Sequence, residues 1–453
     1  MVKILNRYME ANENLKGAII GICIRSAISG EILYKYNHNL RLHPASNMKL
    51  LTAAAALNVL GEDYTFSTQL QLDGKVKDDK LEGSLFLVGQ GDPTLLLKDF
   101  EMFAEKLKQQ GIQKITGDII GDDTWYDHER LSRDLVWKDE QYYYGSEVSA
   151  LTVSPNNDYN TGSVLIRVLP AQIGEKPSIS ILPNTDYVAI TNEAITVKKA
   201  LEEELVIERE HGVNQITIKG KIAYDSETTE QWMSVWGASE FTLSLFSQVL
   251  ASQGVVWNGE IKLGQTPSDA AVLFSKKSVP LSDILIPFMK LSNNGIAEML
   301  IKEMGRKCCG EGSWDAGIPV LKEEMTKFGL DMTQLSIKDG SGISHSNLIP
   351  ANAITQLLYE VQKMNWFPVF LHSLPIAGNE DRIIGGTLQD RMPALSVQAK
   401  TGTIEGVSTL SGYLDIPSGE KLIFSIMVNN LLDEEIGKRI EDEIVKLIVG
   451  NEQ

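Results

Sequence analysis

Apolar and polar positions follow strand-like and helical spacings at both ends of the chain. Residues 1–17 read as a short helix, and residues 433–450 carry isoleucines at helical spacing. Between these helices and the middle of the chain lie short apolar runs separated by turns that contain glycine. These strand-like runs are residues 17–26, 31–37, 396–403, 408–416 and 421–430. The pattern predicts one antiparallel sheet, covered by helices and built from both chain ends.

The middle of the chain differs in its hydrophobic pattern and residue content. Residues 66–148 mix strands with a helix, whereas residues 149–231 are rich in Val, Ile and Thr with many turns, which is typical of a small β-rich domain. Residues 232–270 contain a helix followed by a strand. We therefore predict two domains nested inside a third. The predicted domains are 1–65 with 271–453, then 66–148 with 232–270, and 149–231.

Composition narrows the class of protein. The 453 residues are too many for one core, and 43% hydrophobic with 23% charged residues is ordinary for globular chains. The net charge of -18, without a basic run, argues against nucleic acid or an anionic membrane as the partner. No apolar stretch approaches the ~18 residues of a membrane span. The first residues lack the apolar core of a signal peptide, so the chain is either cytoplasmic or given without its export signal.

The three cysteines give no disulfide framework. Cys308 and Cys309 are neighbours, and Cys23 lies in an apolar run where a small core residue is expected. The sequence contains no H-E-x-x-H zinc motif and no G-x-S-x-G nucleophile elbow. The segment that begins at Gly89 has Thr94 where a dinucleotide fingerprint needs a third glycine. We therefore predict no metal and no cofactor.

Ser46 and Lys49 lie three residues apart at the start of an apolar helix predicted to end before Gly61. Residues with this spacing share one helix face, so the amine approaches the hydroxyl. Burial among apolar neighbours lowers a lysine pKa, which is the condition for a lysine to act as a base. A serine at a helix start also offers its backbone N–H to an oxyanion. The same spacing recurs by chance at Ser418 and Lys421, so it does not decide the function alone.

A second polar step lies in MKLSNNGIAEML, where Ser292 and Asn294 precede a helix. Seen alone, Ser292 or Asn293 is more simply explained as a helix cap. Further along, residues 400–403 read Lys-Thr-Gly-Thr in a predicted strand. Strand alternation places the lysine and the glycine on one face and both threonines on the other. A glycine inside a strand often marks the close approach of another group.

Ser-x-x-Lys, Ser-x-Asn and Lys-Thr-Gly, in this order, form the motif set of class A β-lactamases and penicillin-binding proteins. With segments such as GQGDPTL, IKDGSGISHSN and GTLQDRM, the chain resembles the low-molecular-mass class C penicillin-binding proteins, the D-alanyl-D-alanine carboxypeptidase/endopeptidase family. The resemblance implies an α/β (α+β) fold: a serine transpeptidase/β-lactamase-like domain with an antiparallel sheet flanked by helices, plus two nested domains. It also implies an enzyme that cuts peptidoglycan stem peptides through an acyl-enzyme, is acylated by penicillins, and works outside the cytoplasmic membrane after removal of its signal.

The resemblance also implies residue roles. Ser46 is the acylated nucleophile and Lys49 its proton acceptor, while Ser292 passes a proton to the leaving D-alanine. Asn294 binds the substrate amide, and Lys400 keeps the side of the site that carries the Ser292 hydroxyl polarised. The N–H groups of Ser46 and Thr403 form the oxyanion hole, and the hydroxyls of Thr401 and Thr403 hold the terminal carboxylate. The implied substrate-binding residues in this strand are Thr401, Gly402 and Thr403.

Some members of the family hold the amino end of the stem with a Trp and an acidic residue of an inserted domain. Here Trp137 is the matching Trp, with Asp139 or Glu140 as the acid and Glu140 preferred. One departure is His345, where the family often has Arg, so recognition of the stem side chain is expected to differ. Two alternatives stay open: a β-lactamase or esterase on the same fold, and a wall-binding protein without catalysis. The sequence does not fix the oligomeric state or the balance of carboxypeptidase and endopeptidase action.

Overall fold

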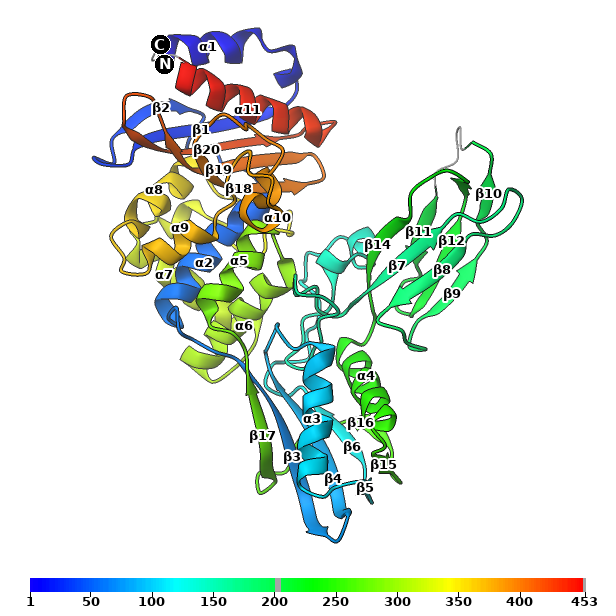
Figure 1. Ribbon diagram of the computed structural model, residues 1–453. Helices are drawn as coiled ribbons and strands as arrows, with labels where there is room; N and C mark the ends of the chain where they lie inside the picture. The colour runs from blue at the N-terminus through cyan, green and yellow to red at the C-terminus, as the bar shows by residue number, and fades with distance from the viewer. Residues whose placement is uncertain (200–204, 451–453) are drawn as a thin grey trace. The chain divides into compact units, whose positions relative to one another are not determined.

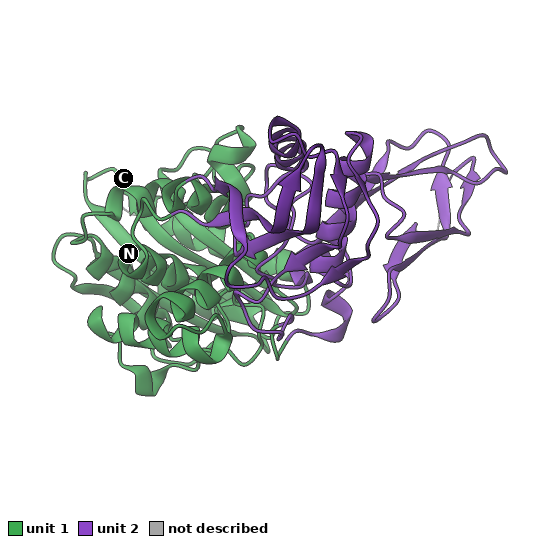
Figure 2. Ribbon diagram, turned by 90° about the horizontal axis from the view of Figure 1, so that it is seen from below, with its two compact units in different colours: residues 1–64, 132–134, 280–453 green, residues 65–131, 135–279 purple. Residues whose placement is uncertain are grey.

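The computed structural model describes residues 1–199 and 205–450, which form two compact units (Figure 2). Unit 1 comprises residues 1–64, 132–134 and 280–453, and unit 2 comprises residues 65–131 and 135–279. Of the predicted domain ranges, 149–231 and 271–453 extend over residues 200–204 and 451–453, outside the described part. The division of the middle region into two nested domains stays a prediction.

The sheet of unit 1 joins the two ends of the chain. Its described strands run in the order β18-β19-β20-β1-β2, and all neighbours are antiparallel. The central pair is β1 with β20, where Ile22 lies opposite Ile426. The strands are β1 (Ile19–Ser26), β2 (Ile32–Tyr36), β18 (Val397–Ile404), β19 (Val407–Asp415) and β20 (Lys421–Asn429). The apolar runs and turns at the chain ends predicted this sheet correctly.

Helices cover both faces of this sheet (Figure 1). α1 and α11 lie on one face, where Ile440, Ile444 and Ile448 of α11 are buried at a spacing of one helical turn. α2 lies among the helices on the other side, and its first ten residues are all buried. The run of small alanines in α2 suits such close packing. The helices of unit 1 are α1 (Val2–Ala11), η1 (Glu13–Leu15), η2 (Ala45–Asn47), α2 (Met48–Val59), α5 (Leu281–Lys290), α6 (Asn294–Cys309), α7 (Trp314–Lys327), η5 (Met332–Gln334), α8 (Ala351–Val361), α9 (Phe367–Ser373), α10 (Arg382–Gly385), η6 (Gly386–Leu388) and α11 (Glu434–Gly450).

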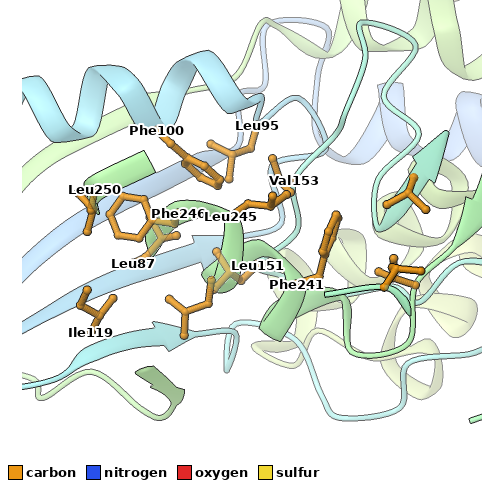
Figure 3. Close-up of a cluster of buried hydrophobic side chains, with 14 of the residues drawn as sticks. Leu87, Leu95, Phe100, Ile119, Leu151, Val153, Phe241, Leu245, Phe246 and Leu250 are labelled. Atoms are coloured by element: carbon orange, nitrogen blue, oxygen red, sulfur yellow. The ribbon is translucent and has the colours of Figure 1, made fainter. Parts of the chain in front are cut away.

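Unit 2 is built on a larger mixed sheet with the strand order β15-β5-β4-β3-β17. In the same sheet β6 pairs in parallel with β4, and β16 pairs in parallel with β6. Figure 3 shows its core, where Phe100 of α3 and Phe246 of α4 pack near Leu87 and Ile119 of the sheet. The elements of this part are β3 (Ser67–Lys77), β4 (Lys80–Gln90), α3 (Leu97–Gln109), β5 (Lys114–Ile115), β6 (Ile119–Asp122), η3 (Trp137–Asp139), η4 (Tyr143–Gly145), α4 (Ala238–Ser252), β15 (Val256–Trp257), β16 (Ile261–Leu263) and β17 (Ala271–Lys277).

Short strands complete unit 2. They pair as β14-β7-β8, β11-β12-β9 and β10-β13 within the described residues. Their bounds are β7 (Ser163–Leu169), β8 (Ser178–Leu182), β9 (Ala189–Asn192), β10 (Ile195–Val197), β11 (Val206–Arg209), β12 (Gln215–Lys219), β13 (Lys221–Ala223) and β14 (Thr229–Ser234). Among the described residues, no helix combines the length and the apolar character needed to cross a bilayer.

Candidate active site

The turn that carries Ser46 is fixed by strand β19. Ser46 lies in the 3₁₀ turn η2, directly before α2. The Thr409 hydroxyl donates to the Pro44 carbonyl at 2.8 Å, and the Asn47 side-chain amide donates to Ser411 Oγ at 2.9 Å. Both bonds are buried, so water competes little with them. The hydroxyls of one strand therefore set the position of the Ser46 turn.

The side chain of Lys49 is fully buried and joins three segments of unit 1. Its Nζ lies 3.0 Å from Ser46 Oγ, 2.6 Å from Asn294 Oδ1 and 2.9 Å from the Ser341 carbonyl oxygen. The first contact is local, whereas the other two partners lie more than 240 residues away in the sequence. The predicted serine–lysine contact is thus present, and Asn294 of the second motif belongs to the same group.

Burial governs the protonation of Lys49. Loss of hydration lowers the pKa of its ammonium to about 7, although the carboxylates of Glu298 and Asp339 oppose this shift. A substantial fraction of the amine is therefore neutral near pH 7, with a lone pair for a proton. The adjacent hydroxyl of Ser46 is the group placed to give that proton.

Glu298 shapes the loop that supplies the third partner of Lys49. Its carboxylate accepts hydrogen bonds from the backbone N–H groups of Gly340 at 3.0 Å and Ser341 at 2.8 Å, and from the Trp314 indole at 2.7 Å. These bonds fix the backbone at Ser341, whose carbonyl faces Lys49. The Glu298 carboxylate therefore positions the lysine indirectly.

Asp339 organises the next part of the same loop. It accepts bonds from the backbone N–H groups of Gly342 and Ser344 and from the Asn347 side chain, at 2.7 to 2.8 Å. Burial, with the nearby Glu298 charge, raises the pKa of Asp339 to about 7. The Ser344 hydroxyl donates in turn to Asp134 at 2.7 Å, so residues 132–134 contribute to this network.

The Ser-x-Asn step contains the helix cap considered from the sequence. Asn293 caps α6, since its side chain accepts from the N–H of Ile296 at 3.0 Å. Ser292 adopts a left-handed backbone with φ 60°, and Asn294 directs its Oδ1 to Lys49. The helix cap therefore fixes the turn that carries Ser292 and Asn294.

Lys400 is also fully buried, and its Nζ donates to the carbonyl of Thr401 at 2.8 Å. Burial holds the pKa of Lys400 well below its usual value, and the charge of Lys49 lowers it further. The two lysines thus lie close enough for their charges to repel. Thr401 is largely buried, whereas Thr403 is exposed.

Gly402 allows β18 to pass directly against the Ser46 turn. A Cβ added at this glycine would lie 2.8 Å from the backbone nitrogen of Ser46 and 2.3 Å from Thr409 Oγ1. Both distances are below ordinary contact. The sequence-based expectation that this glycine marks a close approach is met, and the approaching group is the predicted nucleophile's own backbone.

Trp137 and Glu140 belong to unit 2. The Trp137 side chain is 68% exposed and stacks on the ring of His211, with centroids 3.6 Å apart. Glu140 accepts from His211 Nδ1 at 2.7 Å and lies 3.6 Å from the Arg209 guanidinium. The carboxylate of Glu140 is therefore engaged within its own unit. Sequence reasoning missed His211, because a single histidine in a turn carries no motif.

Comparisons with known proteins identify the family of this chain. The sequence profile of the D-Ala-D-Ala carboxypeptidase 3 (S13) family matches residues 1–449. The chain belongs to this family. It is 40% identical to the D-alanyl-D-alanine carboxypeptidase of Actinomadura sp. (strain R39) over 429 residues, covering 92% of this chain and 78% of that protein.

Solved structures match as well. The crystal structure of penicillin-binding protein 4 from Haemophilus influenzae superposes with a TM-score of 0.83 at 26% identity, covering 96% of this chain and 94% of that one. The same H. influenzae protein has also been crystallised with a β-lactam. Family membership confirms the predicted fold class and the serine-type D-Ala-D-Ala carboxypeptidase, and favours it over the β-lactamase and non-catalytic alternatives. Among the described residues, no group of three or more His, Cys, Asp or Glu side chains offers a metal site.

Proposed function

We propose that this enzyme removes the terminal D-alanine from peptidoglycan stem peptides, with Ser46 as the acylated nucleophile. The observation that carries the proposal is the contact of the buried Lys49 amine with Ser46 Oγ at 3.0 Å. A serine hydroxyl is a weak nucleophile until a base takes its proton. A buried lysine with a pKa of about 7 is such a base at neutral pH.

The reaction begins when Ser46 Oγ attacks the carbonyl carbon of the penultimate D-alanine while Lys49 accepts the hydroxyl proton. The negative oxygen of the tetrahedral intermediate is held by the N–H groups of Ser46 and Thr403. Lys49 then returns this proton through the Ser292 hydroxyl to the nitrogen of the leaving D-alanine, and the C–N bond breaks. Lys400 stabilises this proton path, and water hydrolyses the ester on Ser46 in the second half of the reaction.

The substrate is held along β18. This strand is the last one of its sheet, and residues 375–377 pair with its first residues, 397–399. An extended peptide is able to pair with the edge beyond them, along residues 400–404. The Thr403 hydroxyl binds the terminal carboxylate, and Thr401 contributes to the same subsite through its bond to Thr387. Gly402 lets this strand lie directly against the Ser46 turn. Asn294 contacts the substrate amide and also holds Lys49. This arrangement explains why the enzyme acts on a free carboxyl end.

In unit 2 the exposed ring of Trp137 contacts the stem near its amino end, and Glu140 supports that site. His345, exposed beside the loop of Asp339, takes the place of a charged arginine and changes the selection of the stem side chain. Penicillins act as inhibitors because they form an ester with Ser46 that hydrolyses slowly. The substrate places the enzyme outside the cytoplasmic membrane, in contact with the cell wall.

Digestion of purified, cross-linked wall fragments tests the proposal directly. We expect free D-alanine to appear and to stop appearing once the enzyme has been treated with benzylpenicillin. Chromatography of the products also shows whether cross-links are cut. Wall fragments left unchanged, together with no penicillin adduct on the protein, would contradict the proposed function.

The rate of acylation by penicillin should rise with pH through about 7 and then level off. The neutral amine of Lys49 is the base, and its pKa is lowered to about 7 by burial, so the active form grows as the ammonium loses its proton. Stopped-flow measurement of the second-order acylation constant across this range gives the profile. An inflection near the usual lysine pKa of about 10.4 would show that Lys49 is not the base.

A further inference from the structure

Lys290 is a buried lysine that the mechanism above does not use. It ends α5, two residues before Ser292, and its side chain is 2% exposed. Its Nζ donates to the carbonyl oxygens of Leu374 at 2.7 Å and Ile384 at 3.0 Å. Burial lowers the pKa of Lys290 to about 8, although the Asp381 charge opposes this shift. The lysine thus joins the Ser-x-Asn step to the segment 374–388.

Backbone contacts tighten the same junction. Gly386 has a φ of 54°, and a Cβ added there would lie 2.4 Å from the carbonyl oxygen of Lys290. The start of the segment pairs with β18, since the Ala399 N–H donates to the Pro375 carbonyl at 3.0 Å. Segment 374–388 is therefore held between the end of α5 and the edge of the Lys-Thr-Gly strand.

Thr387 follows Gly386 in this segment, and its side chain contacts strand β18. The hydroxyl of Thr401 donates to Thr387 Oγ1 at 2.6 Å. Thr401 is largely buried, whereas Thr387 is exposed. The proton of Thr401 is used within this pair, so the proton left for a ligand is that of the Thr387 hydroxyl.

We propose that Thr387 is a substrate-binding residue that donates to the terminal carboxylate, and that Lys290 is its positioning residue. The inference rests on the proposed function, and it adds a group from outside the Lys-Thr-Gly motif. A hydroxyl that accepts one hydrogen bond donates a stronger one, so Thr401 strengthens the donor of Thr387. Hydrogen bonds to a charged carboxylate are also stronger than those between neutral groups.

Two thiolester substrates distinguish carboxylate binding by Thr387 from a general loss of activity. They share one acyl-D-alanyl group, and their leaving groups differ only in ending in a carboxylate or a carboxamide. For Thr387→Ala we expect kcat/KM on the carboxylate substrate to fall about 10- to 100-fold, mainly through KM, because one bond to a charged group is lost. The carboxamide substrate should lose less, about two- to fivefold, since its neutral oxygen accepts a weaker bond from that donor.

Thr387→Ser is the matched control, because it keeps the hydroxyl and should stay close to the wild type. Lys290→Met should show the same selective loss on the carboxylate substrate, whereas a merely structural lysine would affect both substrates equally. An equal loss on both substrates, or an unchanged preference in Thr387→Ala, overturns the inference. A wild-type enzyme that cleaves neither thiolester, or shows no preference for the carboxylate, contradicts the proposed function instead.

Discussion

Replacement of Ser46 by alanine is expected to abolish both covalent labelling by penicillin and release of D-alanine. The ester intermediate forms on the Ser46 oxygen, so its removal takes away the acyl acceptor. The site should otherwise keep its shape, because the turn is fixed by Thr409 and Asn47 rather than by the Ser46 hydroxyl. Intact-protein mass spectrometry after exposure to benzylpenicillin measures the adduct.

Ser418→Ala is the control for this experiment. Ser418 begins the other Ser-x-x-Lys match, but it lies exposed in the turn between β19 and β20. Its variant should label and turn over like the wild type. A penicillin adduct that persists in Ser46→Ala would place the nucleophile at another residue.

Replacement of Lys49 by alanine should slow acylation by at least about 100-fold, which is typical of removing a general base. The nucleophile remains, but the amine that lies 3.0 Å from Ser46 Oγ and takes its proton is removed. The variant also leaves Asn294 Oδ1 and the Ser341 carbonyl without their shared donor. Water in the vacated volume is expected to satisfy them, so folding should persist.

Thermal unfolding of Lys49→Ala checks that the loss is chemical. Lys421→Ala is the matched control, since its ion pair with Asp415 at 3.3 Å is partly exposed and such pairs contribute about 0–1 kcal/mol. That control should acylate at the wild-type rate. A Lys49→Ala protein that acylates within about tenfold of the wild type would remove Lys49 from the role of base.

Local patterns predicted the parts of the site that depend on local geometry. The spacing of Ser46 and Lys49 places their side chains together on any helical backbone, and the apolar run around them predicts burial. The strand pattern around Gly402 predicted a close approach. These inferences need only the period of a helix or a strand, which is why a single sequence was sufficient.

The remaining contacts depend on tertiary pairing. The carbonyl of Ser341 reaches Lys49 across 292 positions, and a backbone acceptor carries no residue signature. Lys290 lies beside a recognised motif, yet its carbonyl partners lie 84 and 94 positions away. Thr387 was included in a family-like segment without a role. Sequence spacing does not predict these contacts, because they form only when the edge of β18 and the end of α5 pack against the same segment.

The bond between Ser344 and Asp134 has a consequence for protein engineering. Because residues 132–134 belong to unit 1, this unit is assembled from three separate stretches of chain rather than two. Excising residues 65–279 to obtain a minimal enzyme would also delete Asp134 and leave a buried hydroxyl unmatched beside the Asp339 loop. A working miniature would need a short graft, or a hydrophobic replacement at Ser344, to close that gap.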